Sequence, residues 1–211
     1  MELLRTATVA GSAMGFARRG ALSAAAPLAV AGLALSFCAS LGAQPRARVP
    51  LVDQRSVAPY VPMPWHVVDR IMEVVEVSED DVVYDLGSGD GRILLRAAKS
   101  RGARGVGYEI DPALVEEARS AISAAGVQDR VEVREGDFFD ADLSPATVVT
   151  LFLITSAQRQ LRPKLLEELR PGTRIACYMW EIPGWNPSKT VTVPVSGAAH
   201  PIYVYQVGSH Q

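Results

Sequence analysis

Cysteine is scarce in this chain, which contains only Cys38 and Cys177. Because Cys38 lies in an apolar N-terminal run, the remainder of the chain retains one thiol, which excludes an internal disulfide framework. Histidine is scarce as well, and His66, His200 and His210 have no metal-ligand spacing with one another or with Cys177. The sequence therefore predicts neither a disulfide-stabilised domain nor a metal site.

The chain also has no large excess of charge of either sign. The 21 Lys and Arg residues nearly balance the 23 Asp and Glu residues, which leaves a formal charge of −2. Without a basic excess the composition does not indicate a phosphate-binding surface, so we do not expect nucleic acid as a partner. The length of 211 residues, with 48% hydrophobic and 21% charged residues, is typical of one globular domain plus an additional segment.

One long uncharged run is present, from Ala21 to Leu41, directly after Arg18-Arg19. Such a run is typical of a signal peptide, here with cleavage after Ala43, and about 20 apolar residues would equally suffice for an uncleaved membrane anchor. Both alternatives place the chain at the cell envelope, and neither defines the side of the membrane. We therefore divide the chain into a signal peptide or membrane anchor (1–43), a linker (44–57) and one domain (58–211).

The domain alternates between helical and strand periodicity, which is typical of an α/β sheet. Pro64 can begin the first helix, Asp111-Pro112 a later one that Gly126 ends, and Pro163 the last, which Pro171-Gly172 terminates. Strands are expected at Val82–Asp85, Gly105–Glu109, Val131–Glu135, Thr147–Leu153 and Arg174–Trp180.

Two strand-like segments near the C-terminus, Val191–Val195 and Ile202–Val207, have no helix between them. They predict an antiparallel hairpin at the edge of the sheet. Five parallel strands followed by a reversed pair describe a Rossmann-like seven-stranded sheet, mostly parallel, with helices on both faces.

The most informative stretch is a glycine-rich turn between a strand and a helix. Asp85 ends the strand, and Gly87, Ser88, Gly89 and Gly91 follow it. Glycines allow a sharp turn and close approach of a ligand, and the free N–H groups at the start of the helix suit a carboxylate such as that of methionine. Asp85 could accept a hydrogen bond from the ammonium group of the same ligand. Dinucleotide-binding enzymes place G-x-G-x-x-G at this point, but here the glycines alternate singly and an acid precedes them.

Two further acids follow the next two strands. Glu109 could accept hydrogen bonds from ribose hydroxyls, Asp137 could accept from an adenine amino group, and Phe138 could stack on the adenine ring. A carboxylate at the start of a loop can also be only a solvated cap, and a phenylalanine can also be part of the core. Three acids at three successive strand ends favour a nucleoside ligand.

With these residues the domain resembles the class I S-adenosylmethionine-dependent methyltransferases, whose seven-stranded sheet matches the expected one. Within them it is similar to the ATP-synthase c-subunit lysine methyltransferase family and its bacterial relatives, over about Tyr60 to Val207. The resemblance implies S-adenosylmethionine as cofactor and a protein lysine amine as acceptor. The fourth strand ends in Leu153–Ser156 and lacks the Asn/Asp-Pro-Pro-Tyr sequence of enzymes acting on planar nitrogens. The motifs that carry the resemblance are Pro59–Pro64, Tyr84–Ile93, Asp142–Leu151, Leu161–Leu166 and Leu169–Thr173.

Methyl transfer of this kind requires mainly that a neutral amine be held in line with the sulfonium methyl while water is excluded. An aromatic mouth would lower the pKa of the entering lysine and hold the methylated cation. Its candidates, for which ordinary packing is the alternative, are Tyr60, Trp65, Trp180 and Trp185. No catalytic residue, number of methyl groups or oligomeric state follows from the sequence. A small-molecule methyltransferase and an exported binding protein without catalysis remain alternatives.

Overall fold

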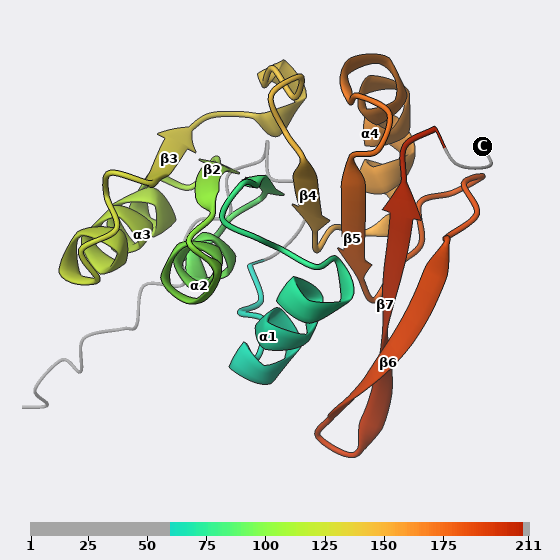
Figure 1. The fold of residues 1–211 in the computed structure, drawn as a ribbon, viewed down its shortest axis with the longest axis horizontal. Helices are drawn as coiled ribbons and strands as arrows, with labels where there is room; N and C mark the ends of the chain where they lie inside the picture. Colours follow the sequence, from blue (N-terminus) through green and yellow to red (C-terminus); the bar gives the residue numbers. More distant parts are fainter. Residues whose placement is uncertain (1–59, 209–211) are drawn as a thin grey trace, which may run out of the picture. The chain divides into compact units, whose positions relative to one another are not determined.

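The computed structural model describes residues 60–208, which form one seven-stranded sheet in the order β3-β2-β1-β4-β5-β7-β6 (Figure 1). The predicted signal peptide or anchor and the linker lie outside the described residues. Within residues 60–208, no helix has both the length and the apolar content needed to cross a membrane. The strands are β1 (Val82–Leu86), β2 (Arg104–Glu109), β3 (Val131–Glu135), β4 (Val148–Leu151), β5 (Arg174–Tyr178), β6 (Lys189–Val195) and β7 (Ala198–Gln206).

The sheet is mixed, as predicted, and the C-terminal hairpin lies at its edge. Strands β3, β2, β1, β4 and β5 are parallel, whereas β7 pairs antiparallel with β5 and β6 pairs antiparallel with β7. Of the two strands of the hairpin, only β7 runs against the first five. The two arms of a hairpin must run in opposite directions, and the hairpin adds to the sheet through β7, so β6 returns to the direction of the parallel strands.

Helices cover both faces of the sheet, as the sequence predicts (Figure 1). One face, which we call the α1 face, carries a core formed with three helices, and the opposite α4 face carries a second core. Because side chains alternate along a strand, neighbours such as Val148 and Val149 are fully buried on opposite faces. The helices are α1 (Trp65–Val74), α2 (Arg92–Arg101) and α3 (Pro112–Ala124) on the α1 face, and α4 (Thr155–Glu168) on the other, with a short 3₁₀ helix η1 (Phe138–Asp140) after β3.

Local signals set the ends of α3 as predicted. Asp111 caps it, its carboxylate accepting a hydrogen bond from the Ala113 N–H at 2.8 Å, and Pro112 is the first helical residue. Gly126 follows the helix with a left-handed φ of 69°. Pro64 likewise directly precedes α1.

The helix between β4 and β5 differs from the prediction, because α4 begins at Thr155 and Pro163 lies inside it. An internal proline costs about 3 kcal/mol because one backbone hydrogen bond is lost. Burial of Ala157, Leu161 and Leu165 on the α4 face offsets that cost. Packing against the sheet thus outweighs the local preference of proline for the first turn of a helix.

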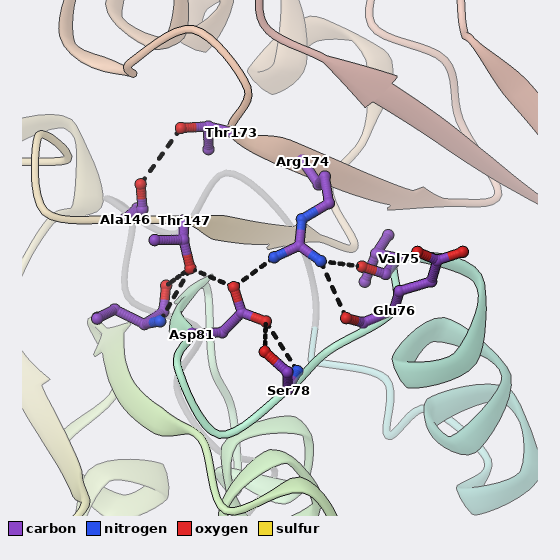
Figure 2. A network of polar contacts seen from close by, with 9 residues as sticks. Val75, Glu76, Ser78, Asp81, Ala146, Thr147, Thr173 and Arg174 are labelled. Atoms are coloured by element: carbon purple, nitrogen blue, oxygen red, sulfur yellow. Dashed lines mark hydrogen bonds and ion pairs between the residues drawn. The ribbon is translucent and has the colours of Figure 1, made fainter.

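A polar network at the amino ends of the strands fixes the loop before β1 (Figure 2). Asp81 accepts hydrogen bonds from Thr147 Oγ1 at 2.7 Å and from the Ser78 N–H at 2.8 Å, and it forms an ion pair with Arg174. Burial alone would raise the pKa of Asp81, but these hydrogen bonds and the Arg174 charge outweigh it and hold the pKa below its usual value. Arg174 also donates to the Val75 carbonyl at 2.5 Å. The network therefore joins the end of α1 to β4 and β5, at the opposite end of the sheet from the glycine turn.

Candidate active site

The glycine turn lies at the carboxyl edge of the sheet, where ligands of doubly wound sheets bind. Gly89 has a φ of 54°, and a Cβ there would lie 2.5 Å from Cε2 of Tyr60. Gly91 has a φ of 74°, and its Cβ would lie 3.1 Å from the Ala118 Cβ. Both positions combine a left-handed backbone with close packing of Tyr60 or Ala118, which accounts for glycine at a sharp turn; the close approach of a ligand stays a prediction.

Glu109, at the end of β2, holds the glycine turn through hydrogen bonds. Its Oε2 accepts from the Gly89 N–H at 2.8 Å, and its Oε1 accepts from the N–H groups of Ile110 at 2.8 Å and Asp111 at 2.9 Å. The Glu109 residue is 9% exposed. The strand-end acids at β1 and β2 are therefore brought to one turn, as their positions predict.

Asp85, at the end of β1, is a buried carboxyl group without an ion-pair partner within residues 60–208. Its Oδ1 accepts a hydrogen bond from Thr150 Oγ1 at 2.7 Å. The pKa of Asp85 is raised to about 7, because burial and the nearby charges of Glu109 and Asp90 raise it by more than the Thr150 hydrogen bond lowers it. A carboxylate here would be stabilised by a cation supplied from outside the chain.

Ser88 presents a second uncompensated polar group in the turn. Its side chain is buried, and within the described part of the chain its hydroxyl has no hydrogen-bond partner. The hydroxyl oxygen lies over Gly107 of β2, where a Cβ would approach it to 2.7 Å. Buried hydroxyls without a partner are rare in proteins and often mark a position that a ligand or water completes.

Asp137 and Phe138 follow β3 at the same edge. Asp137 caps the short helix η1, its Oδ1 accepting from the Phe139 N–H at 2.9 Å. Phe138 is 8% exposed, packs in the core of the α4 face, and its ring centroid lies 4.7 Å from that of Phe139. Phe138 is therefore part of the core in this structure, which is the alternative to stacking on adenine. Asp137 caps η1 and also lies at the end of a strand, where the prediction placed it.

The segment before α1 is anchored over the glycine turn, a feature that residue spacing did not predict. The ring of Tyr60 lies against Gly89 and is 45% exposed. Arg92, the first residue of α2, donates to the Met63 carbonyl at 2.6 Å and forms an ion pair with Asp90 at 2.5 Å. The segment from Tyr60 to Met63 is therefore tied to the turn at both of its ends.

The four predicted entrance aromatics do not form one mouth. Trp65 is 44% exposed, with the guanidinium groups of Arg92 and Arg96 over its ring at 5.3 and 5.1 Å. Trp180 is half-buried beyond β5. The expectation for Trp185 is wrong, because this side chain is 4% exposed and packs in the α4-face core with its ring 5.5 Å from that of Tyr205. The chain turns back at residues 183–184 and carries Trp185 into the core.

A surface hollow of about 760 Å³ lies elsewhere, among the amino ends of β1, β2 and β3, where Asp80, Arg104 and Thr147 line it. None of the predicted site residues lines it. Within residues 60–208, no three His, Cys, Asp or Glu side chains are grouped so that they could hold a metal ion. The glycine turn instead holds the buried Asp85, which has no ion-pair partner within residues 60–208, and the buried Ser88, whose hydroxyl has no hydrogen-bond partner there.

Comparisons with known proteins agree with this geometry. Residues 85–189 match the family model of the ANTKMT methyltransferase domain. The chain is 46% identical over 154 residues to a protein-lysine N-methyltransferase of Saccharolobus islandicus (strain REY15A), covering 72% of this chain and 96% of that protein. It is 33% identical over 129 residues to the ATP-synthase c-subunit lysine N-methyltransferase of Xenopus laevis, covering 61% of this chain and 56% of that longer protein.

Among solved structures, the fold matches that of a protein from Salinibacter ruber described as an RNA methyltransferase in complex with S-adenosyl-L-homocysteine. The TM-score is 0.67 at 50% sequence identity, and the match covers 72% of this chain and 96% of that chain. The similarity thus spans nearly the whole of the archaeal protein and the Salinibacter chain, but only about half of the length of the vertebrate relative.

Proposed function

The chain belongs to the S-adenosylmethionine-dependent methyltransferases with an ANTKMT methyltransferase domain, and from this premise we propose that it methylates the side-chain amine of a protein lysine. The observation that carries the cofactor assignment is the glycine turn with Asp85 and Glu109 at adjacent strand ends, and the similarity to protein-lysine N-methyltransferases supports the lysine acceptor. This arrangement suits a ligand with an ammonium group, a carboxylate and a ribose.

The residues of the turn fit S-adenosylmethionine. The α-amino group of the ligand would supply the cation that the buried Asp85 lacks, and its carboxylate would suit the N-terminus of α2. The free hydroxyl of Ser88 would gain a partner. Glycine at 89 and 91 allows the left-handed φ values of 54° and 74° that the turn needs, and it lets Tyr60 and Ala118 pack against the turn.

Glu109 and Asp137 would hold the nucleoside. A carboxylate has about four lone-pair positions, and three backbone N–H groups already occupy three of them at Glu109. Glu109 can therefore accept one ribose hydroxyl without rearrangement, and a second only if the Gly89 N–H exchanges its acceptor. Asp137 uses Oδ1 for its cap, which leaves Oδ2 for the adenine amino group.

When bound, S-adenosylmethionine supplies a methyl group on a sulfonium that is already activated. The residues of this chain need chiefly to orient the acceptor amine and exclude water, which can lower the barrier by roughly 7 kcal/mol or more in favourable cases. Tyr60 on the glycine turn and Met63, held by Arg92, cover that turn on one side. No acid or base within the turn is required to withdraw a proton from an amine that arrives neutral.

Transfer of labelled methyl groups tests the function directly. The full chain is incubated with methyl-tritiated S-adenosylmethionine and an extract of host cells that do not produce the chain. We expect label in protein, at lysine residues that mass spectrometry locates. Label in the low-mass fraction would instead indicate a small-molecule methyltransferase, and label in RNA would indicate the activity for which the Salinibacter protein is described. Binding of the cofactor without any transfer would support the non-catalytic alternative. A Gly89→Val variant, which cannot accommodate its side chain, is the inactive control.

We further propose that the chain acts at the cell envelope, through cleavage or anchoring of its N-terminal segment. The uncharged run at residues 21–41 supports this proposal. Fractionation of host cells should recover the chain with membranes or envelope contents. Uncleaved chain found wholly in the cytosol would reject the proposal.

A further inference from the structure

A second group of side chains, which we call the aromatic cluster, lies at the carboxyl edge beside the glycine turn. It consists of Phe152, Tyr178, Trp180 and His200. The ring centroid of Phe152 lies 4.8 Å from that of Tyr178 and 5.7 Å from that of Trp180, against which it stacks. Tyr178 Oη and His200 Nδ1 are 2.5 Å apart. The cluster thus combines aromatic faces with one polar pair.

The sheet places this cluster next to the cofactor residues. Leu86 of β1 pairs with Leu151 of β4, so the glycine turn and Phe152 leave neighbouring strands at the same level. A Cβ on Gly87 would lie 3.5 Å from Leu153, which confirms the proximity of the two loops. Phe152 and Tyr178 pack on the α1 face, which is also the face of Asp85, because Asp85 is two residues beyond Val83.

The backbone between Tyr178 and Trp180 is strained. Met179 has a φ of 73°, which is uncommon for a residue other than glycine, and its N–H donates to the Pro201 carbonyl at 3.0 Å. Such conformations persist only where surrounding contacts impose them, and they are concentrated at functional sites. Here β5 ends at Tyr178, and both flanking rings contact Phe152.

The polar pair leaves Tyr178 Oη with acceptor capacity. Burial raises the pKa of Tyr178, so the phenol stays neutral. Whichever of Tyr178 Oη and His200 Nδ1 donates in their hydrogen bond, a phenol oxygen with two lone pairs keeps at least one of them for another donor. Trp180, Phe152 and His200 are only partly buried, so the cluster extends to the protein surface.

We propose that the aromatic cluster binds the side-chain amine of the methyl-acceptor lysine. This inference rests on the proposed function and deepens it. The faces of Phe152 and Trp180 lie beside the neutral amine and attract the methylammonium group that forms when the amine accepts the methyl, and Tyr178 Oη accepts a hydrogen bond from its N–H. His200 is a positioning residue that holds the phenol group of Tyr178 through their hydrogen bond. The cofactor residues on β1 and β2 and the amine site on β4, β5 and β7 thus adjoin along one edge of the sheet.

The test compares two ligands of the full chain by calorimetry. One is S-adenosylhomocysteine, and the other is its analogue in which nitrogen replaces sulfur and carries a four-carbon arm ending in an ammonium group. The parent is expected to bind the analogue at least about tenfold more tightly. Trp180→Leu, Tyr178→Phe and His200→Leu should each lose most of this gain, while their affinity for S-adenosylhomocysteine changes less than about twofold.

The controls separate the cluster from the cofactor site. Tyr203→Phe, on the opposite face of β7, should retain the gain, and Trp180→Phe should restore much of it by keeping an aromatic face. Equal affinity of the parent for both ligands, or an undiminished gain in all three cluster variants, would overturn the inference. Failure of the parent to bind S-adenosylhomocysteine would instead contradict the proposed function itself.

Discussion

Replacing Glu109 with Ala is expected to weaken binding of S-adenosylhomocysteine by about 10- to 150-fold. One cause is the loss of a charged acceptor for the ribose, since hydrogen bonds to charged groups contribute about 1.5–3 kcal/mol. The second is local, because the N–H groups of Gly89, Ile110 and Asp111 all lose their acceptor. The glycine turn is then no longer tied to β2, which favours the upper part of the range.

The fold should survive this change, because the register of β1 with β2 and both cores are independent of the carboxylate. Calorimetry measures the affinity, and thermal unfolding followed by circular dichroism checks the fold. Glu135→Ala is a matched control at the end of the adjacent strand, where the side chain is exposed and a change of less than about twofold is expected. A folded Glu109→Ala variant with parental affinity would show that the ribose assignment is wrong.

A dinucleotide ligand would also make Glu109 a ribose acceptor, so the variant alone does not exclude it. Titration of the parent with NADH tests for a dinucleotide ligand, and we expect no binding. The singly alternating glycines and the buried Asp85 before them suit an amino-acid end of the ligand rather than a second nucleotide.

The fold was predictable where signals are local. Asp111-Pro112 and Gly126 define α3 because a cap, a first-turn proline and a left-handed stop act within a few residues. The predicted start of α4 at Pro163 was wrong because proline, which often begins a helix, is tolerated inside one when burial of a helix face offsets its cost. The direction of β6 was likewise not predictable from periodicity, because alternation of apolar and polar residues identifies a strand but not the strand with which it pairs.

The site divides in the same way. Asp85 and Glu109 were predictable because parallel strands bring their carboxyl ends to one edge. Tyr60 lies on Gly89 and Trp185 lies in the core. Both placements depend on the path of irregular segments, which cannot be predicted from the fact that a residue is aromatic. His200 reaches Tyr178 only because β7 inserts beside β5. Residues that meet through sheet order rather than along the chain were therefore missed.

The second large effect concerns pH and Asp85. Because burial raises the pKa of Asp85 to about 7, its carboxyl group is mostly protonated at pH 6 in the free protein and mostly ionised at pH 8. Only the ionised form pairs with the ligand's ammonium group. The ionised fraction of Asp85 rises about tenfold from pH 6 to pH 8. The ligand's own α-amino group, with a pKa of about 7.7–8.0, has lost part of its protons by pH 8, so affinity for S-adenosylmethionine should rise about fourfold over this range.

The stability of the unliganded chain should move in the opposite direction. A carboxyl group whose folded pKa lies above its ordinary 3.8 contributes stability that is fully present below that value and is lost as pH rises through about 7. The change is on the order of 4 kcal/mol at most, since one pKa unit corresponds to about 1.4 kcal/mol. About 1.4 kcal/mol of it should be lost between pH 6 and pH 8. Unfolding of the free and liganded chain by urea at these two pH values measures this loss, and the stabilisation by ligand should increase with pH.

Asp85→Asn separates electrostatics from shape at this position. Asn can still pair with Thr150 and keeps the form of the turn, but it lacks the charge that the ammonium group requires. At pH 8 it should bind S-adenosylmethionine roughly 10- to 100-fold more weakly than the parent, and the rise in affinity from pH 6 to pH 8 should disappear. The free variant should at the same time be more stable than the parent at pH 8, because an uncompensated buried charge has been removed. If the acidic fall in affinity persists in Asp85→Asn, another group carries it, and the assignment of Asp85 to the ammonium end of the cofactor fails.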